Sequence, residues 1–310
     1  MNEKIVARKA LGGCYYKDYL LPSQRENFEL PKLFFLKTYK VGSSTLAGIL
    51  RGLGDKYGKV TLTPPTGFIK FTGPEDFEEV IKYQNITDGK VDIICNHVEG
   101  YQTSLISKYL GPDYFKMTLI RHPIQRSLSG YYFSRGRPFC QYPVEEWVKN
   151  CTGFKNGCYD VMQDRDLAEF VSPKEAIDSF DLVLITERYT ESLIVLMWKL
   201  GLKITDLLYI TSKKGIRNEV LTEEQERKFG EEVIQENPLD LELFGIGNEV
   251  LDETIAKLPE NYMSQNKMIL DDMIKAIELA CPFSIDDCYF HDNGCARKCI
   301  KDWIASNVQC

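Results

Sequence analysis

Short apolar runs alternate with segments of helical periodicity along the first two-thirds of this chain. A short apolar run bounded by polar residues or glycine predicts a buried strand. Four such runs occur, at residues 33–36, 91–95, 115–120 and 180–185. Each is followed by a segment that favours a helix, near residues 46, 102, 124 and 190. Strands that alternate with helices predict an α/β fold.

The rest of the chain predicts an arm before this core and a helical part after it. Residues 1–31 predict an irregular arm. Further helices are expected at 222–236, 239–258 and 261–280. The first of them starts with Thr222-Glu223-Glu224-Gln225, a capping-box pattern. We expect a single domain over 32–310, with a core at about 32–210 and a helical, cysteine-rich C-terminal part at about 211–310.

The turn after the first predicted strand has the composition of an anion cradle. Its sequence contains two lysines and four serine or threonine hydroxyls. Backbone N–H groups at a helix N-terminus point at a bound anion, and the helix dipole adds positive potential. A glycine at the bend lets the backbone approach the ligand closely. We expect a phosphate or sulfate ester here, bound by Lys37, Thr38, Lys40, Val41, Gly42, Ser43, Ser44 and Thr45.

Two other interpretations of this turn are open. It can be an ordinary helix N-terminus, with Ser43 as N-cap and Lys37 and Lys40 as solvated charges. It can also be compared with the Walker A loop of nucleotide-binding proteins, G-x-x-x-x-G-K-[ST]. No glycine stands five residues before Gly42, and a serine follows Gly42 where that loop has lysine. A nucleotide-dependent kinase would need that lysine and a set of Mg²⁺ ligands, and the sequence offers neither.

A second phosphate-binding pattern follows the third apolar run. The run ends at Arg121-His122-Pro123, and Pro123 suits the first turn of a helix. Ser129 comes eight residues after Arg121, two turns into that helix. The planar guanidinium of arginine can donate two hydrogen bonds to one phosphate. Arg121 and Ser129 are therefore candidates to bind a phosphate group. The alternative is a helix-capping arginine with an incidental serine.

His97 is the candidate general base. It follows the second apolar run, at the expected carboxyl end of a strand, where open α/β sheets bind ligands. Histidine titrates near neutral pH and can take a proton from an attacking hydroxyl. The alternative is a structural histidine. The segment 61–72, which precedes this strand, is expected to be a loop or a short edge strand.

These patterns together resemble the carbohydrate sulfotransferases, and most closely the galactose-3-O-sulfotransferase family. Four segments carry the resemblance: 35–45, 92–97, 119–132 and 292–295, with a weaker likeness at 184–187. The resemblance implies a P-loop-like parallel sheet flanked by helices. It also implies 3′-phosphoadenosine 5′-phosphosulfate (PAPS) as donor, adenosine 3′,5′-bisphosphate as product, and no metal. The implied activity is transfer of the sulfuryl group to a hydroxyl of a galactose-type glycan or glycolipid.

The resemblance also implies individual roles. Lys37 would contact the phosphosulfate, and residues 42–45 would wrap the 5′-phosphate. Arg121 and Ser129 would bind the 3′-phosphate, and His97 would be the catalytic base together with Lys37 as the second catalytic residue. The sequence departs from the family pattern at Tyr39, where histidine is expected, and at Val41, where a small or hydroxyl residue is expected.

A basic loop is a further candidate for the donor site. It comprises residues 213–217 and includes Arg217. We expect Arg217 to close over the 3′-phosphate, and a solvated charge cluster is the alternative. Two other functions stay open for the chain as a whole. One is sulfation of a lipid or small-molecule alcohol, and the other is a kinase-like or non-catalytic P-loop-like protein.

Composition narrows the class of partner. The chain has 310 residues, 44% of them apolar, and a net charge of −7. Nucleic-acid binding needs a basic surface, so this charge argues against it. It also argues against a heavily sulfated polymer and favours a sugar, glycolipid or small alcohol as acceptor. The sequence has no run of eighteen apolar residues, so no spanning segment is expected.

The cysteines bear on localisation. The chain has ten, and five lie near the C-terminus: Cys281, Cys288, Cys295, Cys299 and Cys310. We expect disulfides, with Cys151 and Cys158 as a local pair; zinc bound by Cys288, His291, Cys295 and Cys299 is the alternative. Two N-x-[ST] sequons, at Asn85 and Asn150, suggest a glycoprotein. With disulfides and a trimmed anchor the expected location is the Golgi lumen, and otherwise the cytoplasm.

Overall fold

The computed structural model describes most of the chain. The described residues are 28–65, 70–98, 103–134, 142–151, 170, 172–211, 220–282 and 294–308. Arg217, Cys158, Cys288 and His291 lie outside them, so the predicted role of Arg217 and the predicted pair of Cys151 with Cys158 stay predictions.

A five-stranded parallel sheet forms the centre of the fold. Its strands are β1 (Leu33–Leu36), β2 (Lys70–Phe71), β3 (Ile93–Val98), β4 (Phe115–Ile120) and β5 (Leu182–Ile185), in the order β2-β3-β1-β4-β5. Every pairing between them is parallel. The four predicted strands are confirmed, and so is a short edge strand within residues 61–72. The fold class, an α/β protein with a parallel sheet, is confirmed.

One strand boundary differs from the prediction in a way that affects the site. The apolar run at 91–95 predicts that His97 follows the strand, but β3 extends to Val98 and His97 lies inside it. The reason is the short strand β2, in which Lys70 pairs with His97 and Phe71 with Val98. Because β2 pairs with two residues of β3, that strand continues past the end of its apolar run. The backbone around His97 is therefore fixed by the sheet rather than by a loop.

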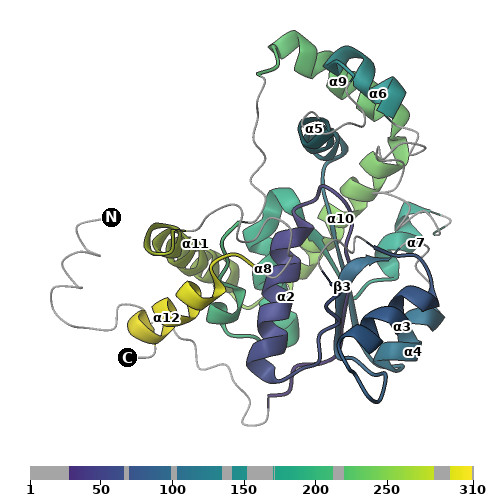
Figure 1. Cartoon of the computed structure of the whole chain (residues 1–310). Coiled ribbons are helices and arrows are strands. Elements are labelled where there is room, and N and C mark those ends of the chain that lie inside the picture. Colours follow the sequence, from purple (N-terminus) through teal and green to yellow (C-terminus); the bar gives the residue numbers. More distant parts are fainter. Residues whose placement is uncertain are drawn as a thin grey trace, which may run out of the picture.

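Helices cover both faces of the sheet. They are α2 (Ser43–Tyr57), α3 (Pro74–Tyr83), α4 (Thr103–Leu110), α5 (Pro123–Ser134), α6 (Val144–Cys151), α7 (Pro173–Asp178), α8 (Tyr189–Leu200), α9 (Glu223–Glu236), α10 (Pro238–Ala256), α11 (Tyr262–Ala280) and α12 (Arg297–Asn307), with 3₁₀ turns η3 (Thr186–Arg188) and η4 (Ile204–Leu207). Figure 1 shows α2 and α8 on one side of the sheet and α3 and α4 on the other. Helices α11 and α12 lie beyond α2, and α5, α6 and α9 form a group at one end.

The apolar core explains this arrangement. All four residues of β1 are fully buried, as expected for the central strand of a sheet covered on both faces. The main core also includes residues of α10, α11 and α12, among them Leu243, Leu270 and Trp303. The C-terminal part therefore packs on the same core as the sheet. A second apolar cluster joins α5, α6 and α9 around Tyr131 and Trp147. The domain boundaries given above stay a prediction.

A buried ion pair links α5 to α10. Arg126 on α5 donates from Nη2 to Asp240 Oδ2 on α10 at 2.7 Å, and both side chains are completely buried. Two buried charges cost much desolvation energy and are stable only as a pair. The pair therefore fixes α5, the helix that carries Ser129, against α10.

Removing one member of this pair is expected to destabilise the fold strongly. Asp240→Asn leaves the guanidinium of Arg126 buried without its counter-charge, and the expected loss is about 3–5 kcal/mol in the free energy of unfolding. Urea unfolding followed by far-ultraviolet circular dichroism measures it. Asp178→Asn is the control, because it breaks the exposed pair Lys174–Asp178 and should cost less than about 1 kcal/mol. Equal losses in the two variants would contradict the prediction.

The described cysteines are oxidised in the C-terminal part. A disulfide joins Cys281, just after α11, to Cys299 on α12, and Cys295 is also disulfide-bonded. Zinc binds cysteine as the thiolate, so the zinc alternative loses two of its four ligands and is wrong as predicted. Cys95, inside β3, is a buried free thiol. Among the described residues, no group of three or more potential metal ligands is present.

None of the described helices combines the length and the apolar character needed to cross a membrane.

Candidate functional site

The carboxyl ends of the central strands bring Lys37 and His97 together. In the register of the sheet, Leu36 on β1 pairs with Asn96 on β3, and the N–H of Lys37 donates to Asn96 O at 3.2 Å. Lys37 and His97 come one residue later on adjacent parallel strands. Because side chains alternate along a strand, those two side chains lie on the same side of the sheet. Both are buried, with 5% and 8% of their surface exposed.

Arg121 joins this edge from the other side of β1. It follows β4, and its Nη1 donates to Lys40 O at 3.0 Å. Its Nε lies 3.8 Å from Glu187 Oε1, which is in η3 directly after β5. The predicted anion loop and the predicted phosphate-binding arginine are therefore in direct contact. Strands β1, β3, β4 and β5 each contribute to one edge of the sheet, where α/β proteins bind ligands.

Two of the predicted ligand hydroxyls hold the loop in shape. Thr38 Oγ1 donates to Leu119 O and Ser43 Oγ donates to Thr38 O, each at 2.7 Å. A hydroxyl has one proton, so neither side chain retains a donor for an anion while these bonds persist. Thr186 Oγ1 adds a third tie, since it lies 2.6 Å from Val41 O. These hydroxyl contacts connect the loop to β4 and to η3, the 3₁₀ turn after β5.

The N-terminus of α2 has no side-chain cap, as the predicted anion cradle requires. Gly42 is the N-cap, with φ of 79°, and no side chain caps the helix. The alternative in which Ser43 is the N-cap is therefore wrong. The first turn of α2 has no acidic residue that would compete with an anion. Positive φ at Gly42 disfavours any residue with a Cβ, and the first-turn N–H groups normally need an acceptor.

His97 is stacked against a residue of the same loop. The rings of Tyr39 and His97 are 3.8 Å apart between centroids and inclined by 13°. Stacking of this kind restricts rotation of the imidazole ring. Tyr39 is one of the two positions at which the chain departs from the family pattern, and the structure gives it a contact with the candidate base.

The remaining predicted residues lie around this edge. Ser129 lies near the middle of α5 and is half-buried. Lys40 places its ammonium 3.9 Å from the centroid of the Phe133 ring, also on α5. His122 shapes the turn into α5, because its Nδ1 accepts from the N–H of Ile124 at 3.3 Å. The loop is thus connected to the helix that carries Ser129.

The sequence analysis did not place Thr186 and Glu187 in the site. Glu187 Oε1 also accepts from the N–H of His122 at 3.2 Å, so it bridges two residues that follow β4. Both residues could have been predicted from the sequence, because they directly follow the fourth apolar run. Three cationic residues, Lys37, Lys40 and Arg121, belong to the segments that follow β1 and β4 at this edge, while the chain as a whole is acidic. The local charge favours an anionic ligand.

The fold is an α/β protein with a glycine-containing loop between its central strand and the next helix. Comparison with known proteins shows which proteins this chain is similar to. Residues 19–151 match the family model described as galactose-3-O-sulfotransferase. This range includes the anion loop, His97, Arg121 and Ser129.

Three relatives agree with that match. Galactose-3-O-sulfotransferase 2 of Mus musculus is 23% identical over 242 residues, which cover 69% of this chain and 61% of the relative. The protein of the same name in Sus scrofa is 23% identical over 229 residues, 64% of this chain and 57% of the relative. Galactosylceramide sulfotransferase of Bos taurus is 26% identical over 201 residues, 57% of this chain and 47% of the relative.

The matches thus span about half to three-fifths of the length of these relatives. They confirm the resemblance to the galactose-3-O-sulfotransferase family of carbohydrate sulfotransferases that the motifs predicted.

Proposed function

We propose that the chain is a PAPS-dependent sulfotransferase that transfers a sulfuryl group to a hydroxyl of a galactose-type glycan or glycolipid. The observation that carries the proposal is the uncapped N-terminus of α2, in a loop tied to Arg121 and stacked on His97. An anion cradle, a phosphate-binding arginine and a base are the three elements that this reaction needs. The family match supports the choice of sulfate over phosphate as the transferred group.

The donor is held by charges and backbone amides in this proposal. The first-turn amides of α2, with Ser44 and Thr45, bind the 5′-phosphate. Arg121, Ser129 and Arg217 bind the 3′-phosphate, which distinguishes PAPS from ATP. Lysine and arginine meet the charge of the donor, so the proposed mechanism uses no metal. Catalysis then consists of positioning and electrostatic stabilisation.

The chemical step is an in-line displacement at sulfur. The acceptor oxygen forms a bond to sulfur while the bond from sulfur to the bridging oxygen of the donor breaks. His97 takes the proton of the acceptor hydroxyl, and Lys37 stabilises the negative charge that grows on the bridging oxygen. Adenosine 3′,5′-bisphosphate leaves. Lys37 and His97 suit these roles because they are adjacent on parallel strands, within the register that joins β1 to β3.

The acceptor and the location are proposed from the relatives and the cysteines. The names of the relatives refer to galactose and galactosylceramide, which supports a galactose-type acceptor. The disulfide of Cys281 with Cys299 supports a location in the secretory pathway, where disulfides form and persist. Asn85, the first sequon, lies in an exposed turn after α3. We therefore propose the Golgi lumen as the site of action.

A transfer assay tests this function. The chain is incubated with sulfur-labelled PAPS and three classes of acceptor: galactose-terminated glycans, galactosylceramide, and simple or steroid alcohols. Labelled galactoside or glycolipid is the expected product. Transfer only to the alcohols would move the proposal to the lipid or small-molecule alternative. No transfer from PAPS, together with phosphate transfer from Mg·ATP, would reject it.

Tyr39 is predicted to position His97. Tyr39→Ala removes the stacked ring, and an aromatic contact of this kind contributes about 1 kcal/mol, so kcat should fall about fivefold. Tyr39→Phe keeps the stack and should stay within about twofold of the wild type. Steady-state kinetics measure both, and the affinity for the bisphosphate should be unchanged. Equal loss in the two variants would mean that the hydroxyl, not the ring stack, is what matters.

A further inference from the structure

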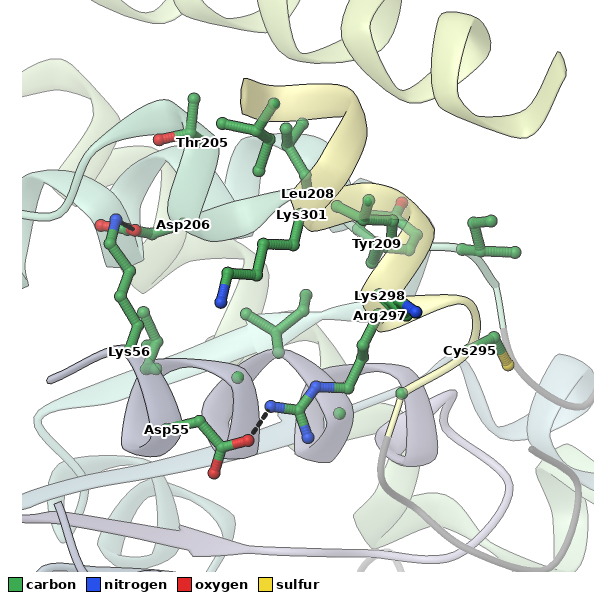
Figure 2. A pocket seen from close by; sticks show the side chains of 18 of the residues that line it. Asp55, Lys56, Thr205, Asp206, Leu208, Tyr209, Cys295, Arg297, Lys298 and Lys301 are labelled. Carbon is green, nitrogen blue, oxygen red and sulfur yellow. Dashed lines mark hydrogen bonds and ion pairs between the residues drawn. The ribbon is translucent and has the colours of Figure 1, made fainter. Parts of the chain in front are cut away.

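A cavity separate from the sheet edge lies between α2, η4 and α12. Its volume is about 730 Å³, within the usual range for small-molecule sites. At one end it reaches Thr45 in the first turn of α2, and at the other it reaches Asp55 and Lys56 in the last turn. The cavity therefore runs along α2, away from the carboxyl edge of the sheet. Figure 2 shows this space between α2 and α12.

Two glycines on the face of α2 that lines the cavity leave room between α2 and α12. Gly48 and Gly52 lie on that face and line the space. A Cβ added to Gly52 would meet no atom within 4 Å, so this position opens directly into the cavity. Gly52 has ordinary helical geometry, and a larger side chain would fit the backbone there.

The walls of the cavity are apolar. Six aliphatic side chains from α2, from the segment directly after η4 and from α12 line it: Ile49, Leu53, Leu208, Ile210, Ile300 and Ile304. Tyr209 lines it as well, and burial raises the pKa of the Tyr209 phenol to about 12, with further contributions from Asp271 and Glu278. The phenol therefore adds no negative charge at neutral pH. A ligand with an apolar body fits such walls.

The rim of the cavity is positively charged. Four cations line it, Lys56, Arg297, Lys298 and Lys301, against the two carboxylates of Asp55 and Asp206. Both carboxylates are already engaged. Asp55 pairs with Arg297 across the cavity, and Asp206 pairs with Lys56 and accepts from the Tyr57 hydroxyl at 2.7 Å.

Two lysines of α12 remain as the source of positive charge. Within the described ranges, no carboxylate pairs with Lys298 or Lys301. Figure 2 shows Lys301 reaching from α12 toward α2. The chain has a net charge of −7, so two such cations beside an apolar cavity favour binding of a negatively charged ligand there.

We propose that this cavity binds a single-chain amphipathic anion, with its hydrocarbon chain against the apolar walls and its anionic head group at Lys298 and Lys301. The apolar volume and the cationic rim together select this class. A neutral amphiphile would leave the rim unused, and a small anion would leave the walls unfilled. This site meets the proposed donor site only at Thr45, and it does not depend on the proposed transferase activity.

Calorimetric titration of the full chain with laurate, below its micelle concentration, tests the proposal. Saturable binding at one site is expected, with much weaker binding of neutral dodecyl maltoside and of acetate. Gly52→Leu fills the cavity and should weaken laurate binding about tenfold or more. Lys301→Gln should weaken it about threefold, as expected for one partly solvated charge.

Two control variants show whether a loss of laurate affinity is specific to the cavity. Gly245→Leu is the control for Gly52→Leu, because Gly245 is an exposed helical glycine of α10 with no atom within 4 Å of an added Cβ. Lys199→Gln, an exposed lysine of α8, is the control for Lys301→Gln. Both controls should bind laurate like the wild type.

Three results would overturn the proposal. The first is absence of saturable laurate binding, and the second is unchanged affinity in Gly52→Leu. The third is displacement of laurate by adenosine 3′,5′-bisphosphate, since that would make the cavity part of the nucleotide site. Failure of the transfer assay would leave the proposal standing, because laurate binding is measured without any donor or acceptor.

Discussion

Replacing His97 with alanine is expected to abolish measurable sulfuryl transfer while the affinity for adenosine 3′,5′-bisphosphate stays within about threefold. A positioned general base contributes about 10²- to 10⁴-fold to the rate, so kcat should fall by that factor. Binding should persist because His97 is proposed to act on the acceptor and not to bind the nucleotide. The backbone at His97 is held by β1 and β2 on either side, so the sheet should survive the change.

His122→Ala is the matched control for this substitution. His122 lies at the same edge, but its ring accepts from the N–H of Ile124 and packs on Phe244. Its loss should reduce kcat far less than the loss of His97. A fully active His97→Ala variant would remove His97 from the mechanism, and a larger loss in His122→Ala would point to the other histidine.

Replacing Arg121 with alanine is expected to weaken binding of adenosine 3′,5′-bisphosphate about 100-fold. Two charge-assisted hydrogen bonds to one phosphate together account for a loss of about 3 kcal/mol. Arg121→Lys keeps the charge but loses the planar fork, so an intermediate loss of about tenfold is expected. Calorimetric titration measures both variants.

A second ligand separates phosphate recognition from loop structure. Adenosine 5′-monophosphate lacks the 3′-phosphate, so its affinity should hardly change in Arg121→Ala. Arg121 also donates to Lys40 O in the loop, and a purely structural role would weaken both nucleotides equally. Equal weakening would therefore contradict the assignment of Arg121 to the 3′-phosphate. Thermal unfolding of each variant shows whether the fold is intact.

Sequence periodicity was sufficient for the elements that bury apolar residues. The runs at 33–36 and 115–120 correspond to β1 and β4 residue for residue. The predicted helices at 222–236, 239–258 and 261–280 match α9, α10 and α11 to within two residues at either end, and the ends at 236 and 280 agree to the residue. The capping box that starts with Thr222 is present, and its hydroxyl accepts from the N–H of Gln225.

Contacts between distant residues could not be predicted from one sequence. The ion pair of Arg126 with Asp240 joins residues 114 positions apart, and nothing local to either residue signals the other. The stack of Tyr39 on His97 likewise depends on how β1 and β3 are paired. The extension of β3 through His97 depends on β2, a strand of two residues without a clear apolar pattern.

The candidate site likewise has one part that the sequence predicts and another that depends on contacts seen only in the fold. The loop at 37–45, His97 and Arg121 were predicted because each follows an apolar run, and the register of parallel strands brings the ends of those runs together. The hydroxyl contacts of Thr38 and Ser43 with protein carbonyls were not predictable, because they depend on the path of the turn. The roles of all these residues in binding and catalysis stay proposals.

The donor site is tested most directly by calorimetric titration of the wild-type chain with adenosine 3′,5′-bisphosphate, with Mg·ATP as the comparison. Saturable binding of the bisphosphate with no detectable binding of Mg·ATP is the predicted result, because Arg121 and the loop of α2 are proposed to recognise the 3′- and 5′-phosphates together. Binding of Mg·ATP without binding of the bisphosphate would contradict the sulfotransferase proposal and favour the kinase-like alternative.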